Sequence, residues 1–184
     1  RSGYTAIHVR DLQTGHDRQL TSQPTRELAR VARELGPEGA IEHVRAHRDH
    51  ELAAEPALAA FLRRRADAAE EPSPELAALY RELFPESRRA REALARELFR
   101  AGSWAAARDA YLELLAETPG AADVGARLAA LGLLEHSTGR SLADLERRPP
   151  TEAEVNRLGY VLLRMDRFAE AIDLFGSNAR RHPE

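Results

Sequence analysis

The chain has 184 residues, of which 43% are hydrophobic and 31% are charged. A disordered chain would be poorer in hydrophobic residues, so we expect a packed core, either in one mid-sized domain or in a short array of helical hairpins. The 27 basic residues are offset by 30 acidic ones for a net charge of -3, which argues against a dedicated nucleic-acid-binding protein with its basic surface.

Several residue types are missing or rare. The chain has no Cys, which excludes disulfides and thiolate metal sites. Every basic residue is Arg and Ala is abundant, a bias that we read as bacterial, with most Arg on solvated helix faces. We see no signal peptide and no apolar run of the roughly 18–20 residues that span a bilayer. We therefore expect a cytoplasmic location, and, because the chain begins with Arg1, a piece of a longer protein.

The first 23 residues differ from the rest. Residues 5–12 alternate and are partly β-branched, residues 13–17 supply turn residues, and residues 18–21 could form a returning strand. This pattern predicts a small β-hairpin or the end of a preceding domain.

After Pro24 the sequence predicts helices only, because Ala and Leu dominate and both favour helix. We expect an N-terminal helical segment over 24–71 and helical repeats over 72–184. Nearly every connection is short, which makes consecutive helices antiparallel neighbours. The predicted helices cover residues 25–35, 38–50, 55–69, 75–84, 86–101, 104–117, 122–136, 141–147, 152–165 and 167–181.

Two stretches of the chain align without a gap. The shared positions are Leu94, Ala95, Leu98, Ala107, Tyr111 and Pro119 in the first stretch and Leu158, Gly159, Leu162, Ala171, Phe175 and Pro183 in the second. This pattern resembles the tetratricopeptide repeat. The resemblance implies an all-α fold of antiparallel hairpins stacked as a short right-handed solenoid, with repeats at 88–121, 152–184 and, in degenerate form, 122–151.

The repeat pattern also predicts individual contacts. Ala171 is expected at the crossing of its hairpin, opposite Gly159, because only small residues allow two helices to approach closely. Glu170 is expected to face water. Trp104 and Phe168 are expected to fill the turns between the helices of their repeats.

A more specific resemblance is carried by the run Asn156-Arg157-Leu158-Gly159-Tyr160, followed by Ala169-Glu170-Ala171-Ile172, Phe175 and Asn178. This run is similar to the tetratricopeptide tail that follows the catalytic domain of some bacterial serine hydrolases of the β-lactamase and esterase type. Residues 38–45 resemble the short helix that precedes such a tail. This resemblance implies a helical appendage of a hydrolase, in the periplasm.

The chain itself carries no catalytic motif that we recognise. It has no G-x-S-x-G, and an S-x-x-K motif is impossible without Lys. We therefore expect no enzyme activity and no cofactor. His43, His47 and His50 share one helix face and could bind zinc, or they are ordinary half-exposed residues, which we favour. The run Arg63-Arg64-Arg65 is either a solvated helix end or an anion site.

The repeat resemblance implies a binding site on the concave side, which the first helices of the repeats line. An Arg-lined groove suits a protein or peptide partner, particularly an acidic segment or a C-terminal carboxylate. We therefore expect an interaction module, with a hydrolase appendage as the alternative. The expected partner-binding residues are Arg89, Glu92, Arg96, Arg100, Asn156, Tyr160 and Arg164.

Overall fold

A computed structural model describes residues 8–10, 17–19, 23–46, 55–68 and 70–182, and it is all-helical after the first twenty residues. Before the helices, β1 (His8–Arg10) and β2 (Asp17–Gln19) pair antiparallel, with Val9 opposite Arg18. The helices are α1 (Gln23–Ala46), α2 (Glu55–Asp67), α3 (Pro74–Leu83), α4 (Arg88–Ala101), α5 (Trp104–Glu117), α6 (Ala122–Thr138), α7 (Leu142–Arg147), α8 (Glu152–Arg164) and α9 (Phe168–Arg181).

These helices confirm the predicted all-α class and, from α2 onward, end within about two residues of the predicted bounds. The predicted break at Gly36 is also present, since Gly36 interrupts α1 with a φ of 74°. This left-handed conformation is one that glycine adopts without a steric penalty. Residues 47–50 of the predicted second helix lie outside the described residues.

Local signals in the sequence explain where helices begin and end. Thr151 and Glu154 form a capping box at the start of α8, each side chain bonding to the other residue's backbone N–H. Gly102 ends α4 in the left-handed conformation, with a φ of 76°. A Cβ at Gly102 would collide with the guanidinium of Arg181. Such caps satisfy backbone groups that a helix end leaves unpaired.

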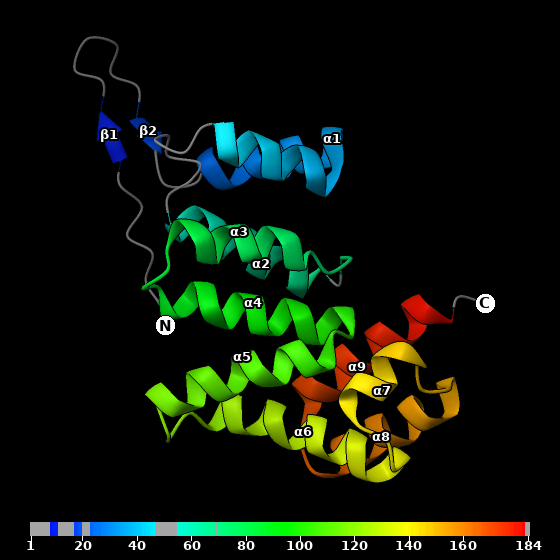
Figure 1. Cartoon of the computed structure of the whole chain (residues 1–184). Coiled ribbons are helices and arrows are strands. Elements are labelled where there is room, and N and C mark those ends of the chain that lie inside the picture. The colour runs from blue at the N-terminus through cyan, green and yellow to red at the C-terminus, as the bar shows by residue number, and fades with distance from the viewer. Residues whose placement is uncertain (1–7, 11–16, 20–22, 47–54, 69, 183–184) are drawn as a thin grey trace.

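Figure 1 shows α1, the α2–α3 pair, α4, α5 and α6 as successive layers, with α7, α8 and α9 gathered at one end. Two apolar clusters hold these layers together. One lies among α1, α2, α3 and the first half of α4, where it includes Ala90 and Ala93. The other runs from Ala95 and Phe99 of α4 through α5 to α9. The helix α4 therefore belongs to both cores.

A buried ion pair lies on α4 between these two cores. Arg100 donates to Glu97 at 2.8 Å, and the two residues are 3% and 0% exposed. The other Glu97 oxygen accepts the backbone N–H of Ser73, just before α3, at 2.8 Å. Arg100 also donates to the backbone oxygen of Glu70. Through these hydrogen bonds the pair holds the linker between α2 and α3 against the second core.

The last helix returns to the middle of the chain. Arg180 donates to the backbone oxygen of Arg100, and the guanidinium of Arg181 lies 4.4 Å from the ring centroid of Trp104. The first and last predicted repeats therefore contact each other directly, whereas in a simple linear stack each repeat touches only its neighbours. The six-residue α7, between them in sequence, is too short to keep them apart.

The predicted contacts of the last hairpin are confirmed only in part. Ala171 is fully buried, as expected. The close neighbour of Gly159 is the ring of Phe175, which a Cβ added at Gly159 would meet. Glu170 is only 6% exposed, so the prediction that it faces water is wrong. Glu170 lies in the first turn of α9, where a negative charge is favoured, and its charge helps to raise the pKa of Arg127, which burial alone would lower.

None of the described helices is long and apolar enough to cross a membrane.

We predict that Ala171→Leu lowers the free energy of unfolding by about 1–3 kcal/mol, because added methylenes overpack a filled core. Ala169→Leu is the matched control: the same substitution, two residues away, at an exposed position, and it should change stability by less than about 0.5 kcal/mol. Urea unfolding followed by circular dichroism measures both. Equal midpoints for the two variants would contradict the packing described for α9.

We predict that Glu97→Ala costs roughly 3–5 kcal/mol of unfolding free energy, because the buried guanidinium of Arg100 keeps only the more distant Asp173, at 3.9 Å, and the N–H of Ser73 loses its acceptor. The control is Glu92→Ala, which removes an ion pair to Arg88 whose side chains are 36% and 44% exposed. Exposed pairs contribute at most about 1 kcal/mol. The prediction fails if both variants unfold at the same denaturant concentration.

Candidate partner-binding site

The predicted site residues fall in two rows on different helices. Arg89, Glu92, Arg96 and Arg100 follow one another along α4, and Asn156, Tyr160 and Arg164 follow one another along α8. The two helices each pack on α9 and have at most marginal contact with each other. The structure therefore does not bring the two rows side by side.

The α4 row offers little to a partner. Arg89 is exposed, Glu92 is paired with Arg88, and Arg96 is half-buried. Arg100 is 3% exposed and is already held by Glu97, as described above. The prediction that Arg100 binds a partner is therefore wrong, because its guanidinium is buried and pairs with Glu97 inside the protein.

Burial shapes the electrostatics where α4 meets α9. Burial lowers the pKa of Arg180, and the nearby charge of Arg100 lowers it further. Burial also raises the pKa of Tyr111, on the neighbouring α5. Arg127 pairs with Asp173 and lies with its guanidinium 5.1 Å from the ring centroid of Phe99. These groups hold helices together and are not arranged around an open site.

The α8 row is more accessible. Tyr160 is 62% exposed, and its ring makes an edge contact with Phe175 at a centroid distance of 5.5 Å. Arg164 is exposed. Asn156 is half-buried and accepts a hydrogen bond of 2.9 Å from Asn178, which orients its amide. Two of the three predicted residues on α8 are therefore free to meet a partner.

Large exposed apolar side chains surround this row. Five of the seven such residues among those described lie on α8, on α9 or at the turn between them. We call them the α8–α9 face: Tyr160, Val161, Met165, Phe168 and Ile172. Val161 and Met165 lie one turn apart at the end of α8, and Phe168 and Ile172 lie one turn apart at the start of α9. A concentration of exposed apolar side chains of this kind is typical of an interaction surface.

The hairpin of α4 and α5, which aligns with that of α8 and α9, shows which elements cover the equivalent surface there. The repeat register places Phe168 where the first repeat has Trp104, and Ile172 where it has Arg108. Trp104 is 1% exposed beneath Arg181, whereas Phe168 is 56% exposed, so the prediction that Phe168 fills its turn is wrong. The turn that Trp104 fills is covered by a later helix, and the turn at Phe168 is open to solvent.

The same register compares the neighbours of the two hairpins. In the first, α5 packs against α6 and α7, and Arg108 reaches Glu135 of α6 at 3.6 Å. In the last, the position of Arg108 is taken by Ile172, which is 65% exposed. A helix therefore packs against this surface of the first hairpin, whereas the equivalent surface of the last hairpin exposes an apolar residue to solvent.

Exposed arginines border the α8–α9 face. Arg157 and Arg164 lie on α8, and Arg167 lies at the start of α9, all three exposed. Unlike Arg100 or Arg127, none of the three forms an ion pair with another described residue. Asp166, exposed in the same turn, offsets one of these charges. The rim of the face therefore keeps an excess of positive charge, although the whole chain carries a net charge of -3.

Sequence reasoning missed Val161, Met165, Phe168 and Ile172 as site residues. A signal for two of them was present in the aligned repeats, because Val161 takes the position of Glu97 and Ile172 that of Arg108. Where the last repeat has an apolar residue at a position that is charged in the first repeat, its surface lacks the helix that covers the first repeat.

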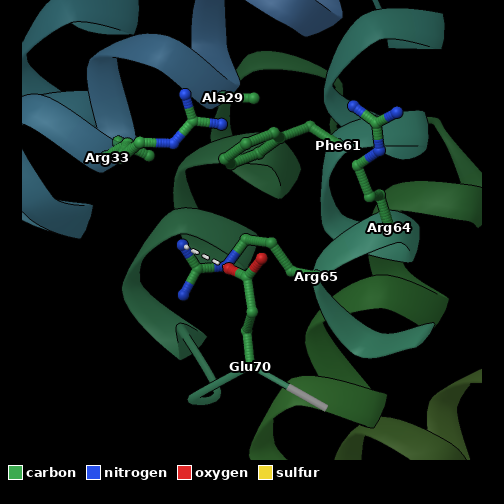
Figure 2. A pocket seen from close by; sticks show the side chains of 7 residues that line it. Ala29, Arg33, Phe61, Arg64, Arg65 and Glu70 are labelled. Carbon is green, nitrogen blue, oxygen red and sulfur yellow. Dashed lines mark ion pairs between the residues drawn. The ribbon is translucent and has the colours of Figure 1, made fainter. Parts of the chain in front are cut away.

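A second feature is a cavity of about 540 Å³ between α1 and α2 (Figure 2). Its lining residues are Ala29, Ala32, Arg33, Phe61, Arg64, Arg65 and Glu70. Two members of the predicted Arg63–Arg65 run thus belong to one pocket. Figure 2 shows Arg33 and Arg64 on either side of the Phe61 ring, with Arg65 beside Glu70.

The histidine cluster cannot be assembled from the described residues, because His47 and His50 lie outside them. His43 is half-buried in α1. Within the part of the chain that the structure describes, no group of three His, Asp or Glu residues is arranged to hold a metal ion.

No protein-family model matches this chain, and no curated protein is significantly similar to it.

Proposed function

We propose that this chain is a non-catalytic helical module of the tetratricopeptide type, which binds a helix of a protein partner on its α8–α9 face. The observation that carries the proposal is the exposure of Phe168 and Ile172, at 56% and 65%, where the matching hairpin has the 1% exposed Trp104 and a charged residue, Arg108. Burying such a pair on binding removes apolar surface from water, which favours association.

The shape of the surface favours a helix as the occupant. Along α9 the row continues from the exposed Phe168 and Ile172 to the half-buried Gly176 and the exposed Ala179, spaced as on one helix face. The small residues allow a second helix to approach closely. A helix laid there would pack on α9 much as α6 packs on α5.

The charge of the rim favours an acidic partner. Arg157, Arg164 and Arg167 would meet the flanks of a helix lying on the face, and carboxylates pair well with guanidinium groups. A second copy of this chain would bring the same three arginines together, and like charges oppose such pairing. The preferred partner is thus an amphipathic helix with an apolar stripe and acidic flanks.

We predict that helices selected on this protein are acidic and depend on the apolar face. The probe is a displayed library of amphipathic helices with a constant Leu/Ala stripe and flanking positions randomised between Glu and Lys. Binders should be enriched in Glu. Phe168→Ser/Ile172→Ser should weaken them tenfold or more, because burying each side chain contributes about 1.5–3 kcal/mol. Titration by fluorescence anisotropy measures the affinity.

The control for that experiment is Leu112→Ser, which changes another exposed apolar residue, on α5 and 48% exposed, and should leave binding unchanged. Lys-rich binders, or binders that tolerate the double variant, would overturn the proposal. Dimerisation of the wild-type protein that the double variant abolishes would assign the face to a second copy instead.

We predict that Arg164→Glu/Arg167→Glu weakens the acidic helices about tenfold or more and strengthens Lys-rich ones, because the rim changes sign. The matched control is Arg63→Glu/Arg89→Glu, which makes the same change in net charge at two exposed positions on α2 and α4. Affinities measured at two salt concentrations separate the local effect from the overall charge. A larger loss in the control would point to the α4 row that contains Arg89.

A further inference from the structure

The cavity between α1 and α2 is built around positive charge. Three arginines and one glutamate line it, which leaves two positive charges in excess. Arg33 and Arg64 are exposed and form no ion pair with another described residue. Their guanidinium groups reach the cavity from different helices, as Figure 2 shows. Each of them therefore has a guanidinium group that is available to an anion in the cavity.

Arg65 is the buried member of the set. It is 7% exposed, with its guanidinium 5.8 Å from the ring centroid of Phe61, and it donates to the backbone oxygen of Glu71 at 2.9 Å. Its contact with the carboxylate of Glu70 is 3.6 Å long, beyond hydrogen-bond distance. Its Nε is buried and makes no hydrogen bond. A buried donor without an acceptor is costly, and a bound oxyanion would supply one.

The other walls are apolar. Ala29 and Ala32 of α1 and the ring of Phe61 complete the lining, and Phe61 is 2% exposed. A volume of about 540 Å³ lies within the range of pockets that bind small organic molecules. The site therefore has room for a carbon body in addition to a charged group, with apolar contact chiefly from the half-buried Ala29 and Ala32.

We propose that this pocket binds a small organic phosphate, with its phosphate held by the lining arginines Arg33, Arg64 and Arg65 and its carbon body against Ala29 and Ala32. A phosphate monoester carries nearly two negative charges at neutral pH, which match the excess charge of the lining. Arginine is well suited to phosphate because its planar fork donates two parallel hydrogen bonds. Glu70, whose side chain is 49% exposed, can turn towards solvent when the phosphate enters.

The experiment is calorimetric titration of the whole chain with phenyl phosphate, inorganic phosphate and benzoate. Phenyl phosphate should bind at least tenfold more tightly than the other two, because benzoate carries only one negative charge and inorganic phosphate has no carbon body. Binding should also shift the NMR signal of the Arg65 Nε–H group. Inorganic phosphate binding as tightly as phenyl phosphate, or no saturable binding of phenyl phosphate, would overturn the proposal.

Variants test the assignment of the residues. Arg33→Gln/Arg64→Gln should weaken phenyl phosphate tenfold or more, and both residues are exposed, so folding is preserved. Arg63→Gln, next in the chain, exposed and outside the lining, is the matched control and should bind as the wild type does. An equal loss in Arg63→Gln would show that general surface charge holds the phosphate. Binding of acidic helices by Arg33→Gln/Arg64→Gln should remain unchanged, which separates this site from the α8–α9 face.

Discussion

The ion pair between Glu97 and Arg100 is the constraint on which the rest of the fold depends. It sits on α4, the one helix that belongs to both apolar cores, and it satisfies the backbone of Ser73 and Glu70 in the linker before α3. Because both charges are buried, the linker before α3 cannot separate from α4 without leaving polar groups of Glu97 and Arg100 unpaired in the core. This contact thereby fixes the position of helices α1 to α3 relative to helices α5 to α9.

Much of the helical pattern follows from the sequence alone. Gly36, Gly102 and the capping residues Thr151 and Glu154 mark helix ends by local chemistry, which acts over a few residues and can be read without the fold. Periodic burial is also local, which is why Ala171 was placed correctly. The resemblance to tetratricopeptide repeats and to the tails of serine hydrolases stays a prediction.

What could not be predicted depends on contacts between distant parts of the chain. Arg100 has the spacing of a groove residue on α4, and only its proximity to Glu70 and to α9 shows that it is buried. Phe168 and Trp104 occupy the same repeat position, yet one is exposed and the other covered, because a helix lies over only one of them. A repeat pattern describes a hairpin and not what packs on it, and in this protein the candidate surface is defined by that difference.

The contact between α9 and the first repeat has a consequence for how the molecule can be observed. Trp104 is the only tryptophan of the chain, is 1% exposed, and lies beneath the guanidinium of Arg181, about eighty residues further along. If α9 separates from α4 and α5, the indole ring loses this cation and meets water. Trp104 therefore reports on the packing of the last helix. Its fluorescence emission distinguishes a molecule in which α9 is packed from one in which α9 has separated.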